Sequence, residues 1–429
     1  MADQPQITAG AYLRLVALGA LVGIPAALVA ALFLTLVHDT EQWLWHDLPD
    51  ALGHSSAPWY LVVGLPMVGG ALVALARLLL PGDGGHRPLD GIALGVTPLK
   101  SGPGIALAGL ASLSFGAVLG PEAPLIALGA VVGLSVTLLV RVGGQEERVL
   151  ATAGSFSAIS ALFGGPLVGG MLMVEGGLGM GAALLPIILP GFVAAAVGYL
   201  IFVGFGTWGG LDAQGLVVPN LPAYEGTHLA DLLVAILVGI LAALVVVAAR
   251  RAASVLDGRA RSRSDISLLL VAGGLAVGLL AQTADWLGAD SQDVLFSGQA
   301  SVPDLIASDS TKIVLILFVA KAIAYAVSLG CGFRGGPVFP AIFLGIALAT
   351  FACVWFDVSP TLAVAVGTAA GTAAVTRLLV TSSLFATLLV GTQGVDAVPA
   401  AVLAACAAWL VIQAVDRRRA ASATADVIN

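Results

Sequence analysis

The sequence predicts an all-α membrane protein with two similar halves, and three observations support this prediction. The chain of 429 residues is 59% hydrophobic and only 10% charged, with a mean hydropathy of +1.03. Apolar windows long enough to cross a bilayer recur along it, and glycine and proline gather in a few short segments. Since soluble domains average about 25% charged residues, this chain cannot cover an ordinary water-facing surface.

One group of apolar windows predicts uninterrupted membrane-spanning helices, because each approaches or exceeds the roughly 17 to 25 residues that a bilayer requires. These windows cover 11–37, 59–80, 182–205, 229–249, 266–280, 313–329 and 399–415. A second group is interrupted by glycine and proline and therefore predicts broken helices. These windows cover 103–139, 150–175 and 338–390.

We expect one polytopic membrane domain over 1–429, with no separate soluble domain. The expected first half covers about 11–205, the second half about 229–415, and a short tail 416–429. The apolar run that begins at Ala11 is too long for the hydrophobic core of a signal peptide, and no cleavage site is evident.

Basic residues mark the expected cytoplasmic side of the membrane. One basic cluster fills the loop between two strong spans, and a second one closes the last span. They comprise Arg250, Arg251, Arg259, Arg261 and Arg263, and Arg417, Arg418 and Arg419. By contrast, the segments 207–231 and 281–310 contain no Lys or Arg. The positive-inside rule therefore predicts a cell-membrane protein with cytoplasmic N- and C-termini and with these two segments outside.

Glycine and proline concentrate in three short segments, which we call the first, second and third knots. They are 81–88 (PGDGGHRP), 120–124 (GPEAP) and 330–340 (GCGFRGGPVFP). Each knot precedes an apolar run, so we expect a helix to begin directly after it. Pro124 and Pro340 fit a helix start, where a missing N–H is tolerated. Non-helical backbone at membrane depth must be surrounded by protein or water, so the knots predict broken helices that converge on an internal site.

The second and third knots lie roughly half a chain apart, and each leads into a similar apolar segment, PLIALGAVVG or PAIFLGIALA. Paired interrupted helices of this kind indicate an inverted repeat with a binding site near the middle of the membrane. Helix starts present free N–H groups and a partial positive charge, so two opposed starts favour a small anion.

Glu122 is the one carboxylate within the apolar run 114–133. Its simplest structural role is to cap the N–H groups of a helix start. A carboxylate in that position would occupy the place of an anion, so the structural role and a gating role overlap at this residue.

Three stretches resemble the CLC family of chloride channels and proton-coupled chloride exchangers. The second knot is similar to the family's G-x-E-x-P signature, 321–345 is similar to the region leading into its G-x-F-x-P motif, and 165–175 (GPLVGGMLMVE) resembles the helix with its inner acid. The stretches occur in the family's order, and the resemblance covers nearly the whole chain. It implies the CLC fold, an inverted repeat whose broken helices meet at a midplane anion site, and usually a homodimer with one pore per subunit.

The resemblance also implies roles for individual residues. Glu122 would be the external gating glutamate, and Glu175 is the candidate for an inner proton relay, although it could instead be a helix-end residue that reaches water. In the first knot, Gly85 and His86 are candidates for anion binding, and His86 could equally face lipid headgroups. The other anion-binding candidates are Pro121, Ala123, Val338 and Phe339.

This chain departs from the family pattern at four places. Gly85 stands where the family usually has a serine, and Pro337 lacks an N–H where a donor is expected. The last tyrosine is Tyr325, so the family's pore-facing C-terminal tyrosine has no counterpart, and Gly176 replaces a second acid after Glu175. We therefore expect channel-like conduction of chloride or similar small inorganic anions, with weak or no proton coupling. The alternatives are a chloride/proton antiporter that uses Glu175 or a water wire, and an unrelated broken-helix transporter of organic anions.

The sequence shows no pattern typical of an enzyme. It contains no His/Asp metal cluster, no G-x-S-x-G motif and no paired carboxylates on one helix, so we expect neither a cofactor nor a metal. The expected partners are a small anion, membrane lipid and a second copy of the chain, and not nucleic acid. Cys331, Cys353 and Cys406 lack ligand spacing and fit small buried hydrophobic residues. Lys321 lies within an apolar span, where it either has a function or extends to the membrane interface.

Overall fold

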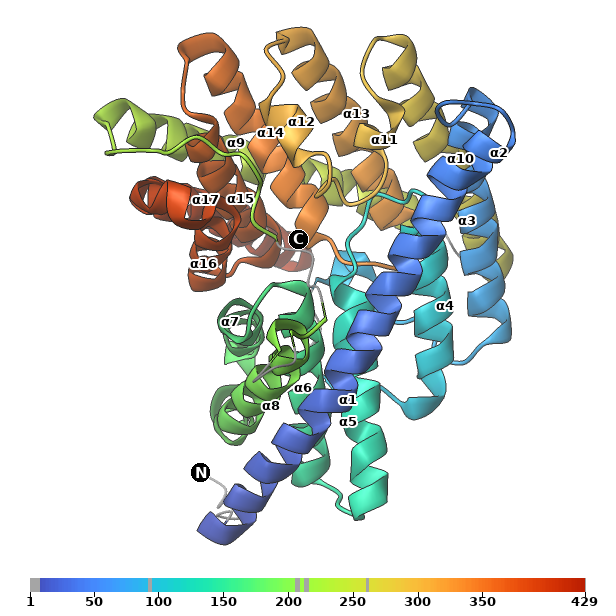
Figure 1. Cartoon of the computed structure of the whole chain (residues 1–429), viewed down its shortest axis with the longest axis vertical. Coiled ribbons are helices and arrows are strands. Elements are labelled where there is room, and N and C mark those ends of the chain that lie inside the picture. The colour runs from blue at the N-terminus through green and yellow to red at the C-terminus, as the bar shows by residue number, and fades with distance from the viewer. Residues whose placement is uncertain (1–7, 92–94, 205–208, 212–215, 260–261, 429) are drawn as a thin grey trace.

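The computed structural model describes residues 8–91, 95–204, 209–211, 216–259 and 262–428, which form a bundle of helices (Figure 1). Within these residues, nine helical segments are long and apolar enough to cross a membrane. The only β-type pairing in this part of the chain is an isolated bridge between Gly120 and Gly336. The protein is therefore an all-α, multi-pass membrane protein, which confirms the predicted class.

The first half begins with the long helix α1 (Ala9–Gln42), which crosses the molecule diagonally in Figure 1. It continues through a π-helical turn (Trp43–Asp47) into α2 (Leu48–Ala51). The other helices of this half are α3 (Trp59–Leu79), α4 (Gly102–Leu113), α5 (Glu122–Val140), α6 (Gln145–Leu162), α7 (Pro166–Gly176) and α8 (Leu185–Val203). Short 3-10 turns occupy Pro88–Asp90, Leu99–Ser101 and Leu178–Leu184.

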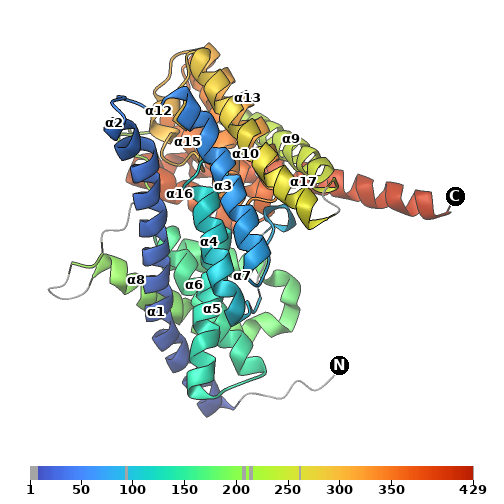
Figure 2. The same ribbon diagram turned by 90° about the vertical axis from the view of Figure 1, so that its right-hand side faces the viewer.

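The second half has the same all-helical character, and its C-terminal helix projects from the bundle in Figure 2. Its helices are α9 (Leu229–Asp257), α10 (Arg263–Trp286), α11 (Ser291–Val294), α12 (Val302–Ile306), α13 (Thr311–Gly330), α14 (Val338–Phe356), α15 (Pro360–Thr376), α16 (Leu379–Val390) and α17 (Val398–Ile428). A 3-10 turn at Gly391–Ala397 joins the last two helices.

Every window predicted as an uninterrupted span contains a helix, and every window predicted as broken contains at least two. The helices extend beyond the predicted windows, most clearly at α17, which continues past 415 through the expected tail to Ile428. Parts of four predicted features lie outside the described ranges. These are Phe205, the end of one predicted window; Arg261, a member of the first basic cluster; residues 207–208 and 212–215 of a segment predicted to be outside; and Asn429, the end of the predicted tail.

The expectation that a helix begins directly after the first knot is wrong. Among the described residues, the 3-10 turns Pro88–Asp90 and Leu99–Ser101 come first, and α4 begins only at Gly102. The intervening sequence contains Gly91, Gly95 and Pro98, which disfavour a continuous helix. Gly91 ends the 3-10 turn with a φ of 83°, a conformation in which other residues are strained.

The helices that follow the second and third knots pack against their next helices in the same way, as expected for a repeat. Both α5 and α14 have 19 residues, and each meets the next long helix through glycines. A Cβ on Gly129 of α5 would lie 2.4 Å from the carbonyl oxygen of Gly154 in α6. Likewise, a Cβ on Gly345 of α14 would lie 2.1 Å from the carbonyl oxygen of Gly367 in α15. Glycine therefore allows close backbone approach at the same step of both halves.

Candidate functional site

The second and third knots meet in a short antiparallel contact. Gly120 donates its N–H to the carbonyl of Gly336 at 2.7 Å, and Gly336 donates back to Gly120 at 2.5 Å. Neither position has room for a side chain, because a Cβ on Gly336 would lie 1.8 Å from Glu122 Oε2 and a Cβ on Gly120 2.2 Å from the same atom. The pairing therefore brings the starts of α5 and α14 together, as the broken-helix pattern predicts.

The carboxylate of Glu122 lies on the start of α14. Its Oε1 accepts hydrogen bonds from the backbone N–H groups of Val338 and Phe339, both at 3.1 Å. The side chain is 1% exposed, and its Oε2 is buried without a hydrogen-bond partner among the described residues. One oxygen of the carboxylate thus accepts hydrogen bonds from two backbone N–H groups at a helix start. Free N–H groups in this position are an arrangement that binds anions.

Three phenylalanine rings pack beside this amide pair. Phe339 of α14 lies 5.9 Å between ring centroids from Phe163, at the end of α6, and also 5.9 Å from Phe385 of α16. Phe163 and Phe385 meet edge to face at 4.7 Å. The rings exclude water from one side of the site, which strengthens the electrostatic effect of the amides.

Buried side chains hold the third knot in place. The hydroxyl of Tyr325 donates to the carbonyl of Pro337 at 2.9 Å, and the side chain of Tyr325 is fully buried. The N–H of Arg334 donates to Ser112 Oγ at 2.9 Å. Pro337 itself precedes α14 and, being proline, has no N–H to offer. Val338 and Phe339 are therefore flanked by Pro337 and by Pro340, so the start of α14 presents two consecutive amides.

An ionic network connects the first knot with the third. Asp83 accepts hydrogen bonds from Arg77 at 2.9 Å and from Arg334 at 2.8 Å. Arg334, which is 2% exposed, also donates to the backbone carbonyl of Asp83, and Arg77 donates to the carbonyl of Gly332. Asp83 and Arg334 are 251 residues apart in the sequence, so these bonds fix the first knot to the third.

Gly85 and His86 lie in the first knot, next to this network. Gly85 has a φ of 97°, and a Cβ there would lie 3.0 Å from Ile105. His86 is half-buried, and its Nε2 has no hydrogen-bond partner among the described residues. Burial lowers the pKa of the His86 imidazole, against the opposing effect of Asp90. Arg87, the next residue of the same knot, pairs with Asp257 at the end of α9.

Glu175 lies at the end of α7 and caps the start of α16. Its carboxylate accepts hydrogen bonds from the N–H groups of Leu379, Val380 and Thr381 at 2.8, 3.0 and 2.8 Å. The Thr381 hydroxyl adds a fourth bond at 2.7 Å. Sequence reasoning missed this cap because its donors lie 204 to 206 residues along the chain. Gly176 follows directly and has no side chain with which to take up a proton.

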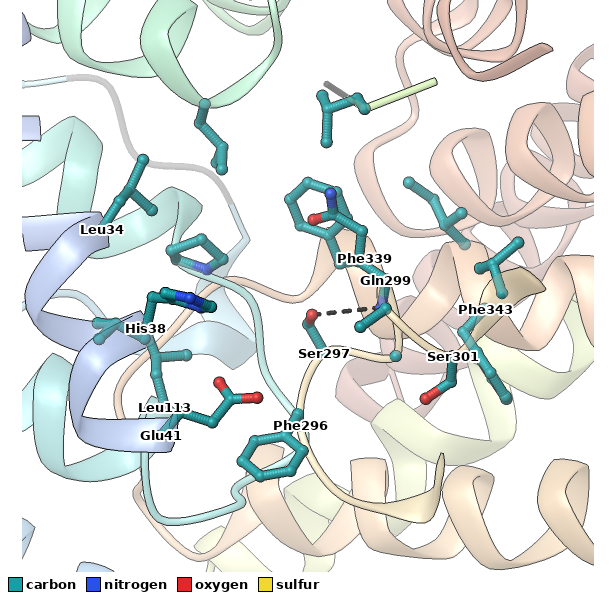
Figure 3. A pocket seen from close by; sticks show the side chains of 18 of the residues that line it. Leu34, His38, Glu41, Leu113, Phe296, Ser297, Gln299, Ser301, Phe339 and Phe343 are labelled. Carbon is teal, nitrogen blue, oxygen red and sulfur yellow. Dashed lines mark hydrogen bonds between the residues drawn. The ribbon is translucent and has the colours of Figure 1, made fainter. Parts of the chain in front are cut away.

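A cavity of about 800 Å³ leads from the two segments without basic residues towards the knots (Figure 3). Its lining includes residues 216–219 and 296–303 and one face of α1. Leu119, Pro121 and Phe339 also line it, so the cavity reaches the residue before Glu122 and one of the two residues whose N–H groups bond to its carboxylate. Pro121 precedes α5, and Ala123 is partly exposed in its first turn.

Lys321 is fully buried in α13, beneath the 296–303 segment. Its Nζ donates to the backbone carbonyls of Asp293 and Leu295 at 2.7 and 2.9 Å, and it lies 4.3 Å from the centroid of the Phe343 ring. The ammonium group therefore stays inside the protein, rather than extending to the membrane interface, and holds the loop that lines the cavity.

Known proteins resemble this chain over most of its length. The family model described as Voltage gated chloride channel matches residues 85–412. YfeO of Escherichia fergusonii, a protein named for ion transport, is 27% identical over 335 residues, which cover 76% of this chain and 76% of YfeO. YfeO of Escherichia coli O139:H28 shows the same identity and coverage.

Solved structures share the fold at 18% sequence identity. A slow cyanobacterial Cl−/H+ antiporter superposes with a TM-score of 0.74, covering 94% of this chain and 95% of the other. A CLC-type fluoride/proton antiporter gives 0.67, with 94% and 96% covered, and a eukaryotic CLC transporter gives 0.68, with 94% and 72% covered. With the family model matching about three quarters of the sequence, the chain belongs to the voltage-gated chloride channel family, known as the CLC family.

Proposed function

We propose that this protein conducts chloride or similar small inorganic anions passively, with weak or no proton coupling, and that Glu122 is its gate. The observation that supports the gate is the position of the Glu122 carboxylate on the amides of Val338 and Phe339. An anion and this carboxylate would compete for the same two donors. Conduction therefore requires the carboxylate to leave, and protonation weakens its hold by removing its charge.

The environment of Glu175 supports the channel-like part of the proposal. A proton relay needs a titratable group that is free to receive and release a proton. The carboxylate of Glu175 instead accepts four hydrogen bonds at the start of α16. Moving it into a pore would leave three amides of that helix start without their acceptor, which is unfavourable. Gly176 cannot take its place.

A coupling measurement tests this proposal directly. Purified protein in liposomes is given an outward chloride gradient at equal internal and external pH, with chloride and pH recorded together. We expect chloride to move without uphill proton movement, and a valinomycin-set potential to control its direction. Proton pumping at a fixed anion-to-proton ratio would contradict channel-like conduction. If Glu175→Gln then abolished pumping but not chloride movement, the relay would belong to Glu175.

We further propose a cell-membrane homodimer with cytoplasmic termini and with 281–310 outside. Cysteines introduced at exposed Ser262 and Ala307, in a chain whose three native cysteines are replaced by alanine, test the orientation. We expect an impermeant thiol reagent added to intact cells to label Ala307→Cys and not Ser262→Cys. The reverse pattern would invert the orientation, and crosslinking in membranes measures the number of subunits.

A further inference from the structure

The ionisable side chains that line the 800 Å³ cavity all come from one face of α1 and its π-helical turn. They are His38, Glu41 and His46. Figure 3 shows His38 and Glu41 on one side of the cavity, with Gln299 and Phe339 across from them. Of the described residues, none that lines the cavity is a Lys or an Arg. Any net positive charge on this lining must therefore come from the two imidazoles.

The other elements around the cavity leave this charge unbalanced. The 296–303 segment contributes hydroxyl and amide side chains, among them Ser297 and Gln299, and α6, α8, α14 and α16 contribute apolar ones. Asp39 and Asp47, on the same helix, are outside the lining. Lys321 lies behind the loop, where two carbonyls and the ring of Phe343 surround its ammonium group.

The cavity leads to the proposed gate. Pro121, which lines it, directly precedes Glu122, and Phe339, which also lines it, donates its N–H to the Glu122 carboxylate. An anion that approaches the amides through this cavity must therefore pass the face of α1 that carries the histidines. His38 and His46 are eight positions apart, which corresponds to about 12 Å along the helix axis.

We propose that His38 and His46 form a proton-switched site that recruits small inorganic anions into this cavity, an inference that rests on the proposed anion conduction. Histidine is the side chain whose charge changes between pH 5 and 8. With both imidazoles neutral the pair carries no charge, and with both protonated it carries a formal charge of +2, beside the carboxyl group of Glu41. A cleft with low-dielectric walls focuses such a charge and raises the local anion concentration.

The experiment separates recruitment from gating by using Glu122→Gln as the parent protein. External chloride is varied at external pH 7.5 and 5.0, and the half-saturating chloride concentration for flux is measured in liposomes. We expect this concentration to fall about fivefold at pH 5.0, because the charge gained by the two imidazoles acts on the anion at close range. In the parent with both His38→Gln and His46→Gln, we expect the ratio between the two pH values to approach one.

His54→Gln is the matched control. His54 is an exposed histidine beyond α2 that lies outside the cavity lining and bonds to Tyr60, so its replacement leaves the fivefold ratio unchanged. Glu41→Gln tests the third group, and we expect it to lower the half-saturating chloride concentration at pH 7.5. Calorimetric titration of bromide into the detergent-solubilised proteins at both pH values gives a second readout that requires no transport.

The outcomes distinguish this proposal from the proposed function. No flux in Glu122→Gln at any pH would contradict conduction through this site, and bromide binding would then decide the role of the histidines. Flux with a half-saturating concentration that is independent of pH overturns recruitment alone. A pH effect that survives loss of both histidines also overturns it, and assigns the effect to Glu41 or Lys321.

Discussion

Glu122 and Glu175 are two glutamates of the first half that each cap the start of a helix in the second half, yet they are held differently. Glu122 offers one oxygen to two amides at 3.1 Å, and its other oxygen has no partner among the described residues. Glu175 engages both oxygens with three amides and a hydroxyl, at 2.7 to 3.0 Å. The Glu122 carboxylate is thus a weakly bonded helix cap, and the Glu175 carboxylate is a tightly bonded one.

The sequence of the capped helix explains the difference. The first three positions of α16 are Leu379, Val380 and Thr381, and all three donate to Glu175. In α14, the first two positions donate to Glu122, but the third is Pro340, which has no N–H. Fewer donors hold a carboxylate less firmly, which suits a gate, whereas the fully bonded carboxylate suits a structural clamp.

The largest expected effect comes from Glu122→Gln. We expect anion flux at external pH 7.5 to rise on the order of tenfold or more and to lose its pH response, because a carboxyl group's neutral fraction falls about tenfold for each pH unit above its midpoint. In the unmodified protein, flux should rise as external pH falls. Chloride efflux from liposomes between pH 4.5 and 7.5 measures both. The exposed Glu225→Gln is the control, and an unchanged pH response in Glu122→Gln would remove the gate assignment.

Glu175→Gln should change stability rather than gating. An amide side chain presents one acceptor oxygen where α16 needs acceptors for three N–H groups, so we expect a loss of roughly 2 kcal/mol in stability. The apparent Tm in detergent, followed by tryptophan fluorescence, should fall by several degrees, with the pH response of flux retained. Thr381→Val removes only the hydroxyl bond and should give a smaller fall. A lost pH response with an unchanged Tm would make Glu175 a functional acid.

The helix starts after the second and third knots could be predicted from the sequence, but the contacts of the site only in part. The glycines and prolines at 120–124 and 330–340 predict breaks whatever the tertiary structure, because they act through the backbone. The cap by Glu175 depends on donors over 200 residues away, which no local pattern encodes. The bond from Tyr325 to Pro337 spans only 12 residues, but it depends on how α13 packs against the third knot, which the sequence does not show. The predicted start of α4 is wrong for a local reason, because Gly91, Gly95 and Pro98 delay the helix.

Tyr325→Phe probes how firmly the weakly held cap is positioned. The change removes the hydrogen bond to the Pro337 carbonyl without changing the ring, so we expect a loss of about 1 kcal/mol in stability. The loss appears as a small fall in apparent Tm. Since the two amides of α14 stay in place, the pH midpoint of flux should shift little. The exposed Tyr60→Phe serves as the control, and a shift of more than one pH unit in Tyr325→Phe would show that its hydroxyl acts on the gate itself.

Pro340→Ala makes the start of α14 more like that of α16, because it restores an N–H at the third position of the helix. If the number of donors distinguishes the gate from the clamp, Glu122 is then held by a third amide. We expect lower flux at neutral pH and a pH midpoint of activation up to about one unit more acidic, since one unit corresponds to about 1.4 kcal/mol and a bond to a charged group contributes a comparable amount.

The same substitution has the opposite consequence once the gate is removed. In the Glu122→Gln background the third amide is available to the anion, so the half-saturating chloride concentration should fall by about threefold to tenfold. Pro360→Ala, at the first position of α15, is the matched control for losing a proline at a helix start. It should change neither the pH midpoint of activation nor the half-saturating chloride concentration. If Pro340→Ala lowered only one of these, the pH midpoint or the half-saturating chloride concentration in Glu122→Gln, the carboxylate and the anion would not be competing for the start of α14.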